Sequence, residues 1–278
     1  KNGVVKAWNA AKLKGKLVFP KDGTIIGIAN NGFEGQDELT EIELSDGITD
    51  IGHHAFSGCS DLISVEIPDS TVNIYNSAFL DCSSLTKIKL SKNLKAINDS
   101  MFSGCSRLSS IEIPDRVTRI GKSAFSGCNS LTSIEISSKV TDIGVSVLSG
   151  CSVLGSIKVD PQNANYTSGE QNNMLVCTKK NQFLAGCANA SIPNTVTSIN
   201  SGAFAGCKDL KNIEIPNSVS KIDSAAFAGC TSLTSIEVPS GVAVIASKVF
   251  YNCTNLTNIK MHKDITSIGN YAFFNCSS

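Results

Sequence analysis

The chain has 278 residues, of which 17% are charged and 6% aromatic, and its 24 Lys and Arg residues balance its 24 Asp and Glu residues. This zero formal net charge excludes a long-range electrostatic attraction to nucleic acid or to an anionic membrane. No stretch approaches the roughly 20 apolar residues of a membrane-spanning helix, so we expect no nucleic-acid partner and no membrane span.

Residues 1–30 resemble a capping segment. The sequence begins at Lys1 without Met or an apolar signal segment, as a mature or trimmed form would. Trp8, Leu13 and Ile25 supply apolar side chains, and Pro20 ends a strand-like run. Because the end coil of a stacked repeat protein exposes its core, solenoids need caps. We predict an N-terminal cap and an irregular first coil over residues 1–30.

A 23-residue period governs the rest of the chain. Cysteines recur at this step at Cys59, Cys82, Cys105, Cys128 and Cys151, and again at Cys207, Cys230, Cys253 and Cys276. A leucine series through Leu62, Leu85 and Leu108 keeps the same step, and so does a phenylalanine series through Phe56, Phe79 and Phe102. Periods of 20–29 residues with Leu-x-x-Leu-x-Leu spacing indicate leucine-rich repeats.

One repeat can be divided into three parts. The segment from Leu131 to Ile136 alternates apolar and polar residues, which predicts a β-strand, and in several repeats a proline ends it. The step from Val140 to Ile143 predicts a second short extended piece. Around Phe125, before Gly127, we predict one short helical turn.

Stacked repeats predict the overall fold class. We expect an α/β-type repeat solenoid, mostly β with short helical turns, curved and right-handed, with a parallel β-sheet on its concave face. Residues 31–278 are predicted to form this one continuous solenoid. The sequence stops within a repeat, at Asn275-Cys276-Ser277-Ser278, so we expect that further repeats follow, in preference to an end coil covered by another chain.

An insertion at about 160–186 lengthens one repeat by ten residues. Met174–Cys177 and Gln182–Leu184 are short apolar runs around a polar turn, which predicts a β-hairpin on the solenoid edge. It is either a tolerated insertion or a protrusion that contacts a partner. In the second case the candidate contact residues are Tyr166, Lys179 and Lys180.

The pattern Ala-Phe-x-x-Cys-x-x-Leu-x-x-Ile-x-Ile-Pro-x-x-Val-x-x-Ile, almost complete in residues 102–125 and 204–227, resembles the BspA-like (Treponema-type) leucine-rich repeats of bacterial surface proteins. The resemblance covers residues 31–278. Thr71, Met101 and Leu148 depart from it at positions that affect packing. The resemblance implies a cell-surface or secreted protein that adheres to host matrix proteins or to other cells.

The repeated cysteines allow three interpretations. Stacked at strand spacing, they could be buried free thiols, a disulfide ladder or metal ligands. Side chains that all point inward favour free thiols that pack as small apolar groups. Paired Cys-x-x-Cys clusters are lacking, so we predict no metal site, and no motif indicates a cofactor.

The polar position between two apolar strand residues should point away from the core, onto the concave face. These positions are Glu43, Glu66, Lys89, Glu112, Glu135, Lys158, Ser191, Glu214, Glu237 and Lys260. Their charges either keep the strands in register as a solvated ladder or form a mildly acidic recognition surface. The neighbouring positions are small and polar, without the Tyr, Trp and Arg that dominate tight interfaces.

Enzymatic activity is not indicated. Glutamates on an open sheet lack the enclosure that separates the pKa values of a catalytic pair, and no nucleophile or phosphate-loop motif is present. We expect a non-enzymatic protein that recognises a protein or cell-surface ligand. The alternatives are a carbohydrate-binding surface protein, which the scarcity of aromatic residues disfavours, and a structural spacer that presents another domain.

Overall fold

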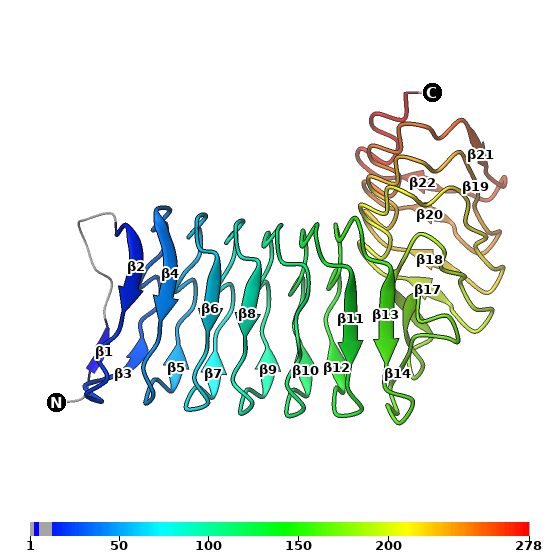
Figure 1. Ribbon diagram of the computed structural model, residues 1–278. Coiled ribbons are helices and arrows are strands. Elements are labelled where there is room, and N and C mark those ends of the chain that lie inside the picture. The colour runs from blue at the N-terminus through cyan, green and yellow to red at the C-terminus, as the bar shows by residue number, and fades with distance from the viewer. Residues whose placement is uncertain (1–2, 6–12, 278) are drawn as a thin grey trace. The chain divides into compact units, whose positions relative to one another are not determined.

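A computed structural model describes residues 3–5 and 13–277 (Figure 1). Trp8 of the predicted cap lies outside the described residues. The chain divides into two compact units, Lys1–Val147 and Leu148–Ser278. Each unit is a parallel β-solenoid, and the whole chain makes about eleven turns. The prediction of one continuous domain from 31 to 278 stays a prediction.

In the first unit each coil contributes to one or both of two strand series. The first series lies on what we call the sheet face and comprises β2 (Gly15–Val18), β4 (Leu39–Glu43), β6 (Ser64–Glu66), β8 (Lys87–Lys89) and β11 (Ser133–Ile136). The second comprises β1 (Gly3–Val5), β3 (Ile25–Ile28), β5 (Asp50–Ile51), β7 (Asn73–Ile74), β9 (Ala96–Ile97), β10 (Arg119–Ile120) and β12 (Asp142–Ile143). Val65 pairs with both Ile42 and Ile88, so the 23-residue period is one step of the stack.

The second unit keeps this plan around the insertion. Its strands are β13 (Ser156–Val159), β14 (Tyr166–Thr167), β15 (Met174–Cys177), β16 (Gln182–Gly186), β17 (Ser198–Ile199), β18 (Lys221–Ile222), β19 (Ser235–Glu237), β20 (Val244–Ile245), β21 (Asn258–Lys260) and β22 (Ser267–Ile268). β19 pairs with β21 on the sheet face, and β20 pairs with β22 in the second series.

The prediction of short helical turns was wrong, because the described residues contain no helix. Each turn instead holds two residues of positive φ, such as His54 (54°) and Gly58 (72°), and such residues break a right-handed helix. Backbone N–H groups then alternate in direction. Ala55 donates within its turn to the carbonyl of Gly52, whereas Phe56 donates to that of Ala78 in the next coil, at 2.8 Å. The turn is therefore part of the stack.

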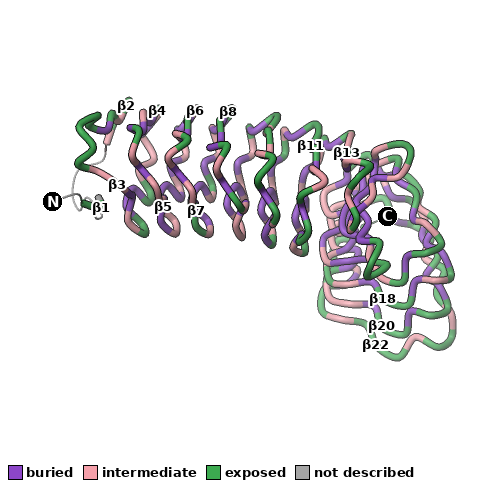
Figure 2. Tube along the Cα trace, turned by 90° about the horizontal axis from the view of Figure 1, so that it is seen from below, coloured by how far each residue is buried: buried purple, intermediate pink, exposed green. Residues whose placement is uncertain are grey.

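Inward-facing side chains form continuous columns in each unit. In Figure 2 the buried residues, drawn in purple, recur in successive coils. The rings of Phe56 and Phe79 lie nearly parallel with centroids 5.4 Å apart, and those of Phe204 and Phe227 are 5.2 Å apart. At the first coil, Phe19 closes this column with its edge against Phe33, at 5.8 Å and 76°. Identical side chains at identical positions therefore pack face to face.

The insertion forms the hairpin of β15 and β16, which is antiparallel, with β14 antiparallel to β15. It belongs to the core of the second unit, because β16 continues as a parallel partner of β17 and Phe183, fully buried, stacks on Phe204 at 4.9 Å. Gly186 makes room for this ring: a Cβ atom there would lie 2.4 Å from the Phe204 ring.

Candidate functional site

The sheet face of the first unit presents the predicted charged positions in register. Glu43 pairs with Glu66, and Glu66 with Lys89, while Ile42 and Val65 beside them turn into the core. Glu66 and Lys89 are exposed, and Glu43 is half-buried. The alternation of the strand therefore places these side chains outward, as the sequence predicted.

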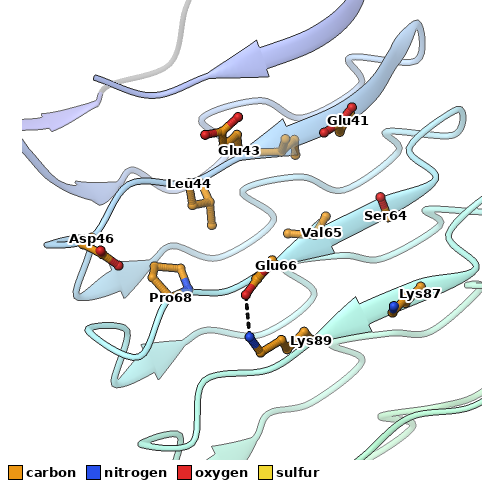
Figure 3. A pocket seen from close by; sticks show the side chains of 11 residues that line it. Glu41, Glu43, Leu44, Asp46, Ser64, Val65, Glu66, Pro68, Lys87 and Lys89 are labelled. Carbon is orange, nitrogen blue, oxygen red and sulfur yellow. Dashed lines mark hydrogen bonds and ion pairs between the residues drawn. The ribbon is translucent and has the colours of Figure 1, made fainter. Parts of the chain in front are cut away.

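Charges on this face pair with each other. The Nζ of Lys16 lies 2.8 Å from Glu41 and 3.1 Å from Glu43, and Lys21 lies 2.9 Å from Glu43. Lys89 is hydrogen-bonded to Glu66 (Figure 3). Hydrogen bonds from Lys21 and Lys16 lower the pKa of Glu43, and the bond to Glu66 raises the pKa of Lys89.

These pairs line a shallow hollow of about 520 Å³. Its lining residues, most of them labelled in Figure 3, are Glu41, Ile42, Glu43, Leu44, Asp46, Ser64, Val65, Glu66, Pro68, Lys87 and Lys89. Since most of its carboxylates already have lysine partners, the hollow offers little uncompensated charge to a ligand. This pairing is consistent with a register-keeping charge ladder, which stays a prediction.

The strand ladder of the sheet face is interrupted at the coils that carry Glu112 and Glu214. Both coils read Ile-Glu-Ile-Pro, at 111–114 and 213–216. Neither belongs to a strand, and the backbone groups of 111–113 and 212–215 have no hydrogen-bond partner among the described residues. Backbone N–H and C=O groups left in this way must be satisfied by water or by a ligand.

In the second unit, Glu214 is an exposed carboxylate without an ion pair among the described residues. Its neighbour Glu237 is held by Lys260, with Nζ to Oε1 at 2.7 Å. Lys158 and Ser191 are also exposed on this face. Glu214 thus resembles Glu112 in the first unit, which is also exposed and has no ion pair among the described residues.

Three shallow hollows of about 500, 380 and 350 Å³ share Glu214 and Ile213 in their linings. Around these two residues stand the amides of Asn194 and Asn212 and the ring of Pro216. We call this set the Glu214 groove. It combines one free carboxylate, unpaired backbone groups and a half-buried apolar residue, which are the elements of a peptide-binding surface.

The candidate residues of the insertion are not alike. Tyr166 is only 7% exposed, so it is a core residue and is a poor candidate for partner contact. Lys179 and Lys180 lie exposed in the turn between β15 and β16. Of the three candidate residues, the two lysines are the ones exposed to a partner at this hairpin.

All eleven cysteines are free thiols, and all but the half-buried Cys276 are buried. In the repeated position the Sγ–H donates to a backbone carbonyl: Cys82 to Phe56 at 3.1 Å, and Cys230 to Phe204 at 3.2 Å. Burial raises the pKa of Cys59 and Cys128 to about 12. Because the thiolate is the reactive form, these cysteines serve packing. No metal-binding group of three His, Cys, Asp or Glu side chains occurs in the described part of the chain.

Sequence reasoning missed a group of aromatic residues on the turns of the second unit, the exposed Tyr271 and Phe274 and the half-buried Tyr251. Comparison of the turn positions from coil to coil could have found them, because Ala228 and Ala205 precede Tyr251 at the same position and Ala225 stands two coils before Tyr271.

Comparison with known proteins identifies the repeat. The model of the BspA type leucine rich repeat region matches in six copies, over residues 26–155 and 180–278. The chain belongs to this family. None of the curated proteins matches the chain.

Among solved structures, a leucine rich cell surface protein of Faecalibacterium prausnitzii is similar, with a TM-score of 0.80 and 28% identity over 95% of this chain and 77% of its own. A leucine-rich repeat protein of Eubacterium ventriosum has a TM-score of 0.66 and 21% identity over 95% of this chain and 82% of its own. The pneumococcal vaccine antigen PcpA has a TM-score of 0.65 and 21% identity over 91% of this chain, but the chain spans only 58% of PcpA.

These relatives support the bacterial leucine-rich repeat assignment, and the fold is consistent with protein recognition. The last two structures, at 21% identity, show likeness of fold alone. In the part of the chain that the structure describes, no helix has the length and apolar character to cross a membrane.

Proposed function

We propose that the chain is a non-enzymatic recognition protein of the bacterial surface or its surroundings, which adheres to a protein partner through the sheet face of its second unit. The observation that carries this proposal is the Glu214 groove. There the strand ladder opens, and the backbone groups of 212–215 and the Glu214 carboxylate stand without partners among the described residues.

The chemistry of the groove favours a protein partner. An extended peptide can offer backbone donors and acceptors to residues 212–215 and a Lys or Arg side chain to Glu214. Hydrogen bonds to a charged group contribute roughly 1.5–3 kcal/mol, more than exposed ion pairs that are already compensated. In the first unit, Lys89 occupies Glu66 and Lys16 occupies Glu41, whereas Glu112, in the other interrupted coil, is unpaired among the described residues as Glu214 is. The Glu214 groove adds to its free carboxylate three hollows that Glu214 and Ile213 line together.

Location at the cell surface or in the extracellular medium is part of the same proposal. The F. prausnitzii relative is described as a cell surface protein, and an adhesive surface needs access to partners outside the cell. Host matrix proteins are therefore the first partners to test.

Binding to immobilised fibronectin and fibrinogen, measured by biolayer interferometry, tests the proposal. We expect one of them to bind, and Glu214→Gln to weaken binding about tenfold, which corresponds to about 1.4 kcal/mol. Glu66→Gln, the matched change on the compensated face, should leave the affinity unchanged.

Two results would overturn the proposal. One is the absence of binding to either protein, which would favour a structural spacer. The other is an equal loss of binding affinity in Glu214→Gln and Glu66→Gln, which would show that the Glu214 groove has no special role in binding.

A further inference from the structure

The hairpin of β15 and β16 ends in an exposed turn that carries two positive charges. Residues 178–181 form this turn, and all four are exposed. The support beneath it is fixed, because β15 is buried along its whole length and Thr178 donates through N and Oγ1 to the carbonyl of Asn165, at 2.9 and 3.0 Å. Lys179 and Lys180 are therefore presented from an ordered part of the core.

These two lysines keep their charge uncompensated. Neither belongs to an ion pair in the part of the chain that the structure describes, and residues 171–208 contain no Asp or Glu. Glu170 lies before β15, at the end of the strand opposite to the turn. The carboxylate of Asp160 accepts a backbone N–H two residues on, and Lys221 is paired with Asp223 at 2.8 Å. The positive charge of the turn is therefore available to a ligand.

The hairpin turn borders the Glu214 groove. β16 pairs in parallel with β17, and the carbonyl of Asn181 accepts the N–H of Thr197 at 2.8 Å. The turn therefore lies beside residues 195–197 of the next coil. Asn194, which comes directly before this segment, lines two of the three hollows of the groove. A ligand in the groove thus lies next to the two lysines.

A short distance separates the positive and the negative end of this surface. The register from β16 through β17 to β18 (Lys221–Ile222) spans two coil steps, which Figure 1 shows for β17 and β18, and it brings Lys179 level with Ser218, four residues after Glu214. At about 4.8 Å for each step, the Cα atoms of Lys179 and Glu214 are roughly 10–16 Å apart. About three to five residues of an extended peptide span this distance, since each adds about 3.3 Å.

We propose that the partner of the Glu214 groove presents a bipolar segment. In this segment a Lys or Arg side chain pairs with Glu214, and an Asp or Glu side chain about three to five residues away pairs with Lys179 or Lys180. Between the two charges lie the amides of Asn194 and Asn217, which line the groove and both donate and accept hydrogen bonds. This inference rests on the function proposed above and names the chemistry of its partner.

The two opposite charges also select against other partners. A segment with basic residues alone satisfies Glu214 but brings like charge to the hairpin turn, and a purely acidic segment meets the same penalty at Glu214. Repulsion of this kind excludes wrong partners and fixes the register of the right one. Because both lysines are exposed, their pairing adds specificity more than affinity.

Fluorescence anisotropy with labelled, otherwise uncharged peptides tests the proposal. The bipolar peptide carries one Arg and one Asp four residues apart and is made in both chain orders. In the basic peptide Asn replaces the Asp, and in the acidic peptide Gln replaces the Arg. We expect the better bipolar peptide to bind about fivefold more tightly than the basic peptide, as one exposed ion pair contributes at most, and the acidic peptide to bind least. High salt should diminish this preference.

Variants of the hairpin turn locate the acidic contact. Lys179→Gln combined with Lys180→Gln should lower the affinity for the bipolar peptide to that for the basic peptide, because the Asp of the peptide loses its partner. Lys208→Gln removes another exposed lysine of the second unit and is the matched control. It should leave the preference for the bipolar peptide intact.

The possible results separate this inference from the function on which it rests. Equal affinity for the bipolar and basic peptides, with Glu214→Gln still weakening both, would overturn the bipolar segment and leave the groove as the binding site. A preference that persists in the double lysine variant would overturn it too, because the acidic residue would then bind elsewhere. Binding of none of the peptides would overturn the peptide chemistry of the groove as well.

Discussion

Residues that are neighbours in the chain follow different rules on the two sides of a turn. The inward series Phe227, Phe250 and Phe273 repeats one residue in successive coils, whereas the outward series beside it reads Ala228, Tyr251 and Phe274. An inward ring is confined by the rings of the coils before and after it, so a change of shape disturbs both neighbours. An outward side chain faces solvent and is free to vary. Repetition therefore reflects the packing of the core, and the outward positions are free of that demand.

Alkaline pH should produce the largest effect on the inward side. Burial raises the pKa of nine thiols, that of Cys207 and Cys253 to about 12. A thiol of the unfolded chain titrates near 8.5, so between these values the folded state holds protons that the unfolded state has lost. The stabilisation is complete below pH 8.5 and falls as pH rises, by about 1.4 kcal/mol for each buried thiol at pH 9.5.

Urea midpoints at pH 7.5, 8.5 and 9.5, measured with reductant present, check this expectation. In Cys230→Ala, the free energy of unfolding should fall less steeply with rising pH, and the difference should equal the contribution of one thiol. A free energy of unfolding that stays level from pH 8 to 9.5 would show that the thiols do not titrate on unfolding as argued.

Removal of a core ring tests the difference between inward and outward residues of the turn directly. Phe227 is fully buried and stacks on Phe204 at 5.2 Å and on Phe250 at 5.6 Å. Phe227→Ala should lower the free energy of unfolding by about 3–5 kcal/mol, because it leaves a cavity inside the column. Phe274→Ala, on the outward side, should cost less than about 1 kcal/mol. Equal losses in urea denaturation would abolish the distinction between the two series.

A smaller effect is expected from the backbone of the turn. Ala225 has a φ of 57°, a conformation that favours glycine. Ala225→Gly should therefore stabilise the protein by about 0.5–1 kcal/mol. Ala228→Gly, three residues on and without positive φ, should destabilise it by a similar amount. The melting temperature should rise in Ala225→Gly and fall in Ala228→Gly. A shift of both melting temperatures in the same direction would refute the role assigned to the positive φ of Ala225.

The smallest effect should come from the charge ladder of the sheet face. Lys260 and Glu237 form an exposed pair at 2.7 Å, and such pairs contribute at most about 0.5–1 kcal/mol. We expect Lys260→Gln to lower stability by no more than this, and only at low salt. Lys179→Gln, in the hairpin turn, provides the matched control. A loss of several kcal/mol in Lys260→Gln would mean that the ladder determines strand register more strongly than we infer.

Much of the scaffold was predictable because stacking repeats local chemistry. The Cys, Leu and Phe series indicated a solenoid with a 23-residue step, and the pairing of Ile42, Val65 and Ile88 follows that step. The predicted helical turn was wrong because the positive φ at positions such as His54 depends on bonds to the next coil. No propensity of a single turn contains that information. Tyr166 was named as a candidate contact residue for a similar reason, since its burial depends on the path of the insertion.

The sequence by itself determined the repeat, the residues that face inward and the order of charges on the sheet face, because each of these follows from a fixed period and the alternation of a strand. The tertiary structure alone decided which charges are compensated. Glu66 has Lys89, whereas Glu214 stands in a coil whose ladder bonds are absent. It also decided that three aromatic rings separated by 20 and by 3 residues meet on one outer surface, because residues one coil apart become neighbours only after stacking.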